Sequence, residues 1–249
     1  MADPTRDNTR LTEEERKRVF EGFNEKRNNA THDLWEAQKY RATLNSKQTT
    51  GLFDEWVGAG CGQYENDVKT LGYQGPQLTA QYLAKYIPQN RDQSKVLDVG
   101  AGSGLSGTEL KKAGFTNVDW LDPSENSIPP AKKTNAYSRF INEYLTAQPL
   151  DVAPDTYDAI TCVGAFFEGC LPIECFTEMI RIVKPGGYIV MSISCTSLET
   201  CKEYNGRLEP RILELAEAKE WELVEKTKEP EYLINVPAMF YVLRVLRSG

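Results

Sequence analysis

The sequence is poor in the long apolar stretches that membrane and secreted proteins carry. No run of roughly eighteen consecutive apolar residues occurs, which is the length that a membrane-spanning helix requires. The opening segment, MADPTRDNTR, also lacks an apolar stretch of the kind that secretory signal peptides have. From these two absences we expect a soluble, cytoplasmic protein with no membrane partner.

Residues that bind metals are scarce or badly spaced. The sequence has one histidine, His32, and its 6 cysteines form no C-x-x-C pair, which excludes the usual Cys/His zinc sites. No cluster of carboxylates requires a metal either. We therefore expect no bound metal, and we expect the cysteines to be free thiols in a reducing compartment.

Positive charge is also in short supply. The chain has 29 basic and 36 acidic residues, a formal net charge of -7, and no run of Lys and Arg forms a basic stripe. An acidic surface repels the phosphates of nucleic acids unless basic residues are concentrated locally. We expect no nucleic-acid partner and favour a small-molecule substrate. A protein side chain as substrate stays open, as does the choice between a monomer and a homodimer.

What the sequence does contain, from residue 76 onward, is an alternation of short apolar runs and helical segments. Predicted strands cover residues 95–100, 118–122, 139–145, 157–165, 188–194, 221–227 and 239–246. Predicted helices cover residues 76–87, 105–114, 175–184 and 209–220. Such alternation is typical of an α/β fold with helices on both faces of a parallel sheet. We predict a Rossmann-like, doubly wound sheet of seven strands, mostly parallel, with an antiparallel C-terminal strand.

The N-terminal segment has a different composition. Residues 1–75 are too polar to form a core of their own, although residues 11–27 and, more weakly, residues 33–47 have helical patterns. We predict that residues 1–75 form a helical cap, laid over a main domain at residues 76–249.

Two glycine-rich hexapeptides, VGAGCG at residues 57–62 and VGAGSG at residues 99–104, are almost identical. The second follows a predicted strand and leads into a helix. There, glycines let a ligand approach the backbone, and the N–H groups of the helix terminus are free to bind it. The first follows the polar stretch FDEW, with no buried strand before it and no clear helix directly after it. We interpret the first as a flexible hinge and the second as a cofactor loop.

The spacing within the second loop indicates which cofactor it binds. In residues 100–104 the third glycine comes one residue too early for the dinucleotide fingerprint G-x-G-x-x-G. The carboxylate of Asp98 would repel a pyrophosphate but suits a ligand with an ammonium group, such as S-adenosylmethionine (SAM). Asp122, at the end of the second strand, can accept hydrogen bonds from both hydroxyls of a ribose. The alternative for Asp122 is a helix N-cap, because Pro123 follows it.

Four segments stand in a recognisable order and spacing: KVLDVGAGSG at 95–104, LD at 121–122, YDAITCVGA at 157–165 and KPGGY at 184–188. Together they resemble the class I SAM-dependent methyltransferases, over residues 76–249. Two further stretches are FDEW…YENDVKTLGYQGP within residues 53–76 and VGAFFEG at 163–169. These resemble a narrower group, the methyltransferase-like proteins of the Williams–Beuren region.

The resemblance implies SAM as the methyl donor and S-adenosylhomocysteine (SAH) as the product. It implies a glycine loop beneath the methionine part of SAM. Asp98 would bind the ammonium group, directly or through water, and Asp122 would hold the ribose. Tyr144 stands where the family often has an acidic residue that accepts from the adenine amino group. The residues implied to bind the cofactor are Asp98, Gly100, Ala101, Gly102, Gly104, Asp122, Pro123, Tyr144, Leu145, Val163 and Tyr73.

The loop after the fourth predicted strand faces the methyl acceptor in this family. Here it reads VGAFF at residues 163–167, not the Asn/Asp-Pro-Pro-Tyr sequence with which one branch binds a planar nitrogen. This argues against a nucleobase amine or a glutamine amide as the acceptor. Phe166 and Phe167 either line an apolar pocket or belong to the core.

Three residues are candidates for catalysis. Glu168, just past the fourth strand, is a candidate general base, and its alternative is a surface carboxylate. His32 is the sole imidazole, but it lies in the cap, where a polar segment usually leaves a histidine solvated. Tyr64, near Trp56, matches a family position that closes over the donor.

These features predict a SAM-dependent methyltransferase that acts on a nitrogen or oxygen atom of a small molecule by in-line displacement. Three alternatives stay open: a catalytically silent SAM-binding or interaction protein, a protein methyltransferase, and an NAD-dependent oxidoreductase. The last of these leaves the glycine spacing and the KPGG sequence at residues 184–187 unexplained.

Overall fold

The structure of the protein is a computed structural model that describes residues 45–58, 63–167, 169–233 and 236–247. The helical pattern at residues 11–27 lies outside these ranges, as does most of the one at 33–47. Within the described ranges, no helix is both long and apolar enough to cross a bilayer.

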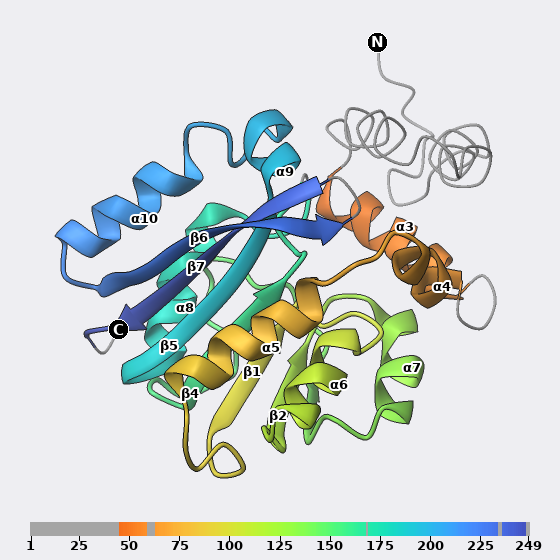
Figure 1. Cartoon of the computed structure of the whole chain (residues 1–249), viewed down its shortest axis with the longest axis horizontal. Helices are drawn as coiled ribbons and strands as arrows, with labels where there is room; N and C mark the ends of the chain where they lie inside the picture. The colour runs from red at the N-terminus through yellow and green to blue at the C-terminus, as the bar shows by residue number, and fades with distance from the viewer. Residues whose placement is uncertain (1–44, 59–62, 168, 234–235, 248–249) are drawn as a thin grey trace.

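A seven-stranded sheet in the order β3-β2-β1-β4-β5-β7-β6 forms the centre of the molecule (Figure 1). The strands are β1 (Lys95–Val99), β2 (Asn117–Leu121), β3 (Arg139–Ile141), β4 (Tyr157–Val163), β5 (Val183–Ser194), β6 (Trp221–Leu233) and β7 (Val236–Val245). Neighbours from β3 to β5 pair in parallel, whereas β7 runs antiparallel to both β5 and β6. The predicted α/β fold, mostly parallel with an antiparallel C-terminal strand, is confirmed.

Helices pack on both faces of this sheet, and β1 shows why. The helices after the N-terminal part are α5 (Gly75–Tyr86), α6 (Leu105–Lys112), α7 (Ile128–Lys133), α8 (Phe176–Ile182), α9 (Cys195–Thr200) and α10 (Leu208–Glu217). Val96 shares a buried cluster with Leu83 of α5 and Leu110 of α6, whereas Leu97 shares one with Phe176 of α8. Successive side chains of a strand point to opposite faces. Because both faces of β1 are apolar, the sheet needs a helical layer on each side.

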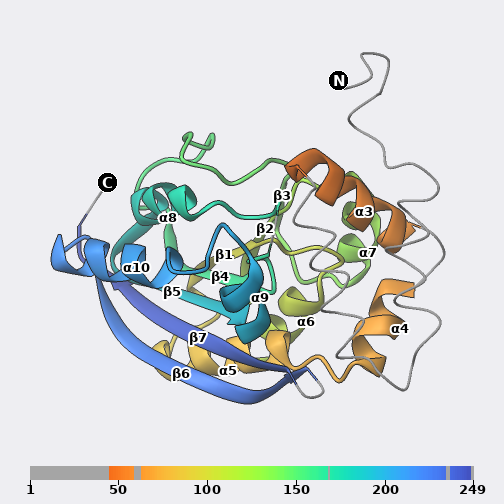
Figure 2. The same cartoon turned by 90° about the horizontal axis from the view of Figure 1, so that it is seen from above.

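Two helices of the N-terminal part, α3 (Ser46–Gly58) and α4 (Gln63–Thr70), lie next to each other at one end of the sheet (Figures 1 and 2). α4 follows directly on the first glycine hexapeptide, so the expectation of no helix there is wrong. Glu65 in its first turn and Lys69 in its last turn complement the helix dipole. The interior of the predicted hinge, residues 59–62, lies outside the described part of the chain.

The start of α3 is fixed by a reciprocal capping box. The backbone N–H of Gln48 donates to Oδ1 of Asn45, and the backbone N–H of Asn45 donates to Oε1 of Gln48, both at 3.0 Å. The sequence asparagine-x-x-glutamine therefore starts a new helix at a point where the periodicity predicts the end of one.

Several predicted strands differ from the observed ones in length: β6, for example, runs to Leu233 rather than to residue 227. β3 ends at Ile141 rather than at residue 145, because β2, its partner in the described sheet, already ends at Leu121 opposite Ile141. β5 starts at Val183 rather than at residue 188, so the KPGG sequence lies inside a strand. The register between β4 and β5 shifts at this point. Glycine is required at Gly187, because a Cβ there would lie 2.7 Å from the carbonyl oxygen of Asp158.

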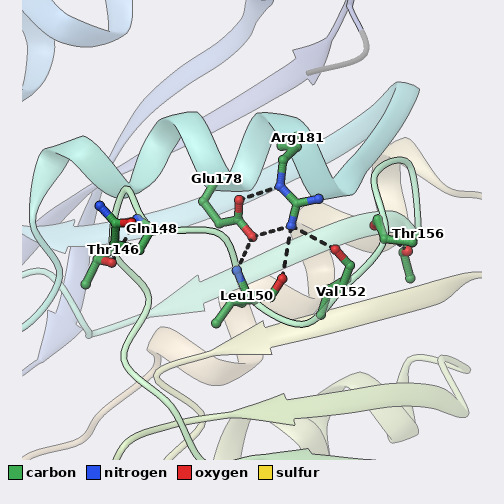
Figure 3. Close-up of polar contacts among 8 residues, drawn as sticks. Thr146, Gln148, Leu150, Val152, Thr156, Glu178 and Arg181 are labelled. Carbon is green, nitrogen blue, oxygen red and sulfur yellow. Dashed lines mark hydrogen bonds and ion pairs between the residues drawn. The ribbon is translucent and has the colours of Figure 1, made fainter.

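One ion pair from α8 fixes the long connection between β3 and β4 (Figure 3). The guanidinium of Arg181 donates to both carboxylate oxygens of Glu178 at 2.6 Å, and that carboxylate accepts from the backbone N–H of Leu150 at 2.9 Å. Arg181 also donates to the carbonyl oxygen of Val152 at 2.8 Å. The carboxylate of Glu178 is buried, and Arg181 is its counter-charge.

We expect Arg181→Ala to lower the free energy of unfolding by about 3 kcal/mol, because it leaves the buried carboxylate of Glu178 without a counter-charge. Urea denaturation followed by circular dichroism would measure this. The matched control is Lys112→Ala, which removes an exposed pair with Glu109 and should cost less than about 1 kcal/mol. Equal effects of the two substitutions would contradict the assignment.

Candidate functional site

A cavity lies at the carboxyl ends of β1 to β4, with about 830 Å³ of empty space that includes open solvent at its mouth. β2 and β3 lie on one side of β1 and β4 on the other, so the cavity occupies the switch point where open α/β sheets bind ligands. The described residues that line it are Thr50, Phe53, Val57, Tyr64, Val99, Gly100, Gly102, Ser103, Leu121, Asp122, Pro123, Ser127, Glu143, Tyr144, Leu145, Val163, Gly164, Ala165, Phe167, Gly169, Cys170 and Leu171.

The glycine loop after β1 adopts a conformation that other residues rarely adopt. Gly100, Gly102 and Gly104 have φ values of +66°, +48° and +95°. A Cβ at Gly100 would lie 2.5 Å from the Cβ of Ala165, whereas a Cβ at Gly102 would meet nothing within 4 Å. Gly100 therefore permits close packing, and Gly102 leaves open space against its backbone. Gly104 stands before the first residue of α6 and is not among the cavity residues.

Asp98 lies behind this loop and is fully buried. Its carboxylate accepts hydrogen bonds from Ser106 Oγ at 2.6 Å, from the hydroxyl of Tyr137 at 2.8 Å and from Thr161 Oγ1 at 3.0 Å. Burial raises the pKa of Asp98 to about 6, while these three donors act in the opposite direction. Asp98 is not among the residues that line the cavity, and its carboxylate instead contacts side chains of α6, of β4 and of the segment before β3.

Asp122 lies on the wall of the cavity itself. Its Oδ2 accepts from the backbone N–H of Gly102 at 2.9 Å, and its Oδ1 accepts from that of Ser124 at 2.8 Å. The second bond is the local cap that is the alternative interpretation of this residue, and the position on the cavity leaves room for the ribose interpretation as well. Burial raises the pKa of Asp122 to about 6, with smaller contributions from the charges of Asp54 and Asp98.

The segment after β3 contributes three neighbouring residues to the cavity. Leu145 is buried, whereas Tyr144 is 40% exposed and donates its hydroxyl hydrogen bond to Thr50 Oγ1 at 3.0 Å. Tyr144 therefore contacts α3. Glu143, one residue earlier, supplies the carboxylate on this side of the cavity. Glu143 was not predicted as a site residue, although it is a carboxylate directly before Tyr144, the position where the family often has an acidic residue.

Hydrogen bonds of polar groups on α3 hold this helix over the cavity. Ser124 Oγ donates to Oδ1 of Asp54 at 2.5 Å, and Asn126 Nδ2 donates to the backbone carbonyl of Asp54 at 3.0 Å. With the bond between Thr50 and Tyr144, the helix is held to the loops after both β2 and β3. No sequence motif pointed to this role for Asp54.

Two tyrosines of the N-terminal part reach the cofactor loop. Tyr64 lines the main cavity and, with Tyr73 and Ala101, a smaller one that also contacts the glycine loop. The ring of Tyr64 packs edge-on against Trp56 with centroids 4.9 Å apart. The hydroxyl of Tyr73 lies 3.1 Å from that of Tyr232, a partner that the sequence analysis did not identify.

The phenylalanines after β4 divide between the two roles left open for them. Phe167 lines the cavity, whereas Phe166 is buried and packs against Phe176 and Tyr204 in the core. Two candidate catalytic residues, Glu168 and His32, lie outside the described residues.

Comparison with known proteins places this geometry in a family. A model of the methyltransferase domain matches residues 71–232. The chain is 30% identical over 175 residues to human methyltransferase-like protein 27. The aligned region covers 70% of this chain and 69% of that protein. This relative agrees with the resemblance drawn from the sequence.

Solved structures share the fold at low sequence identity. One is a complex of the Trm112 methyltransferase activator with a methyltransferase from Haloferax volcanii, with a TM-score of 0.59 at 15% identity, covering 78% of this chain and 98% of that one. Another is 1,6-didemethyltoxoflavin-N1-methyltransferase from Burkholderia thailandensis with bound SAH. Its TM-score is 0.55 at 16% identity, and the match covers 80% of this chain and 89% of that one.

We expect Gly100→Ala to lower the free energy of unfolding more than Gly102→Ala does. Both residues have positive φ, which costs an L-residue about 1–2 kcal/mol, but only at Gly100 does the new methyl group also collide with Ala165. Overpacking adds about 1–3 kcal/mol. Chemical denaturation of the two variants would measure the difference, and a larger loss in Gly102→Ala would contradict the geometry.

We expect the affinity for SAH to increase about tenfold as the pH rises from about 5 to about 7. The pKa of Asp122 is raised to about 6, so the carboxylate that would accept the ribose hydroxyls forms only as the pH passes through that value. Calorimetric titration would measure the dissociation constant at each pH. Asp122→Asn should flatten most of this profile, and an unchanged profile in that variant would remove Asp122 as its source.

Proposed function

The chain belongs to the family of SAM-dependent methyltransferases, and on this premise we propose that it methylates a nitrogen or oxygen atom of a small molecule. The observation that carries the proposal is the cavity at the carboxyl ends of β1 to β4, which α3 and the glycine loop both line. The helix over this cavity leaves a large polymer little access, which favours a small acceptor.

The residues of the cavity fit SAM in three respects. The backbone of Gly102 is open to a ligand, since a Cβ there would meet no atom within 4 Å. Asp122 and Glu143 offer carboxylates, the first to ribose hydroxyls and the second to the adenine amino group. None of the described lining residues is Lys or Arg, which suits a donor that carries positive charge.

Bound SAM supplies a methyl group on a positively charged sulfur, which is an excellent leaving group. The acceptor's nitrogen or oxygen would form a bond to the methyl carbon as the carbon–sulfur bond breaks with its electron pair on sulfur. A proton on the acceptor atom would pass to a base or be lost to bulk water when the product leaves. The products are the methylated acceptor, SAH and a proton. The protein must supply alignment and the exclusion of water, and orientation alone lowers such barriers by about 7–11 kcal/mol.

Described side chains contribute to alignment and shielding. Thr50 and Asp54 hold α3 over the cavity and so keep water out. Burial raises the pKa of Tyr73 well above its usual value, so its hydroxyl stays protonated and acts as a donor or orienting group, not as a base. We keep Glu168 as the proposed base for acceptors that need one, because its neighbours Phe167 and Gly169 line the cavity.

The proposal includes a cytoplasmic setting and a cap at residues 1–75 that covers the main domain. Five described cysteines, all without disulfides, support a reducing compartment. They are Cys162, Cys170, Cys175, Cys195 and Cys201.

The experiment that tests the proposal uses SAM with a tritiated methyl group. The purified protein is incubated with whole cell extract and, separately, with extract freed of macromolecules, and label is followed into small molecules and polymers. We expect label in small molecules, and at least a tenfold loss of it with Asp122→Ala. Leu213→Ala, an exposed change on α10, is the matched control.

Label only in protein would replace the small-molecule proposal with a protein methyltransferase. No label from either extract, with SAH bound tightly in calorimetry, would favour the catalytically silent SAM-binding protein.

A further inference from the structure

The cavity beneath α3 has two chemically different ends. The cofactor end lies over β1, β2 and β3, where the glycine loop, Asp122 and Glu143 line it. The other end follows β4, on the opposite side of β1 in the sheet order. We infer, on the basis of the proposed function, that this second end is an acceptor subsite for a neutral, largely apolar molecule that contains an aromatic ring.

The walls of the acceptor subsite are apolar on both sides. Phe53 and Val57 come from α3, and Ala165, Phe167 and Leu171 come from the segment after β4. The residues from α3 and those after β4 are more than a hundred positions apart in the sequence, so the subsite exists only when α3 lies over the sheet. Apolar surface of this extent gains most from an apolar ligand, because each partner then leaves water.

Two of these side chains are aromatic and lie close together. The ring centroids of Phe53 and Phe167 are 5.4 Å apart, with the ring planes tilted by 50°. Both side chains are partly exposed, and both line the cavity, unlike the buried Phe166. Tilted aromatic rings accept a further ring in an offset or edge-on arrangement. A flat ring is therefore the shape that these two side chains recognise best.

Charge decides which ring-bearing molecules fit. No Lys or Arg is found among the described residues that line the cavity, and its two described carboxylates, Asp122 and Glu143, follow β2 and β3. A carboxylate or phosphate on the acceptor would lose its water and meet no cation in these walls. The subsite therefore selects neutral molecules over anionic ones.

A matched pair of ring compounds tests this inference. 2-Naphthol is neutral at pH 7, and 2-naphthoate has the same ring system with a negative charge. Calorimetry first measures SAH binding to the full-length protein, and each ring compound is then titrated into the protein saturated with SAH. We expect 2-naphthol to bind at least tenfold more tightly than 2-naphthoate. Phe167→Ala should weaken 2-naphthol binding about tenfold and leave SAH binding within twofold, whereas the control Leu213→Ala should change neither.

The outcomes separate the inference from the proposed function. Equal or tighter binding of 2-naphthoate would overturn the selection for neutral molecules. Failure of 2-naphthol to bind the SAH-loaded wild-type protein, or binding that Phe167→Ala leaves unchanged, would overturn the subsite and leave the proposed function intact. Absence of SAH binding itself would overturn the proposed function. The comparison of the two compounds needs only the wild-type protein, so it holds even if a variant does not fold.

Discussion

The rest of the site depends on the hydrogen bonds that the buried carboxylate of Asp98 accepts. Its three hydroxyl donors come from α6, from the segment before β3 and from β4, so one side chain at the end of β1 joins elements on both of its sides. Burying a carboxylate is unfavourable without such donors, and the pKa raised to about 6 shows that they offset the cost only in part. These hydrogen bonds hold the glycine loop in a fixed position at the carboxyl end of β1.

A second layer of contacts closes the space above that loop. Asp54 of α3 accepts from Ser124, whose backbone N–H donates to Asp122 on the cavity wall. Two hydrogen bonds through Ser124 therefore connect Asp122 on the cavity wall with Asp54 on the covering helix. Phe53, on the same helix, packs against the ring of Phe167. In the proposed function, the covering helix therefore both shields the methyl-transfer site from water and completes its apolar end.

The sequence predicted those parts of the structure that depend on local patterns. The sheet follows from the alternation of apolar runs, and the positions of Asp98, Asp122 and the glycine loop follow from their place at the ends of strands. The roles of Asp54, Tyr137 and Tyr232 could not be predicted, because each depends on a partner at least 39 residues away. The helix after the first glycine hexapeptide was missed because its sequence is polar and short.

The most direct test of the central claim is a crystal structure of the protein with SAH. We predict SAH along the loop from Gly100 to Gly102, its ribose hydroxyls within hydrogen-bonding distance of Asp122, α3 over the ligand, and the end lined by Phe53 and Phe167 unfilled. SAH bound elsewhere, or SAH whose binding requires α3 to leave the cavity, would contradict the account. The first result would establish a covered site with room for a second, apolar molecule beside the donor.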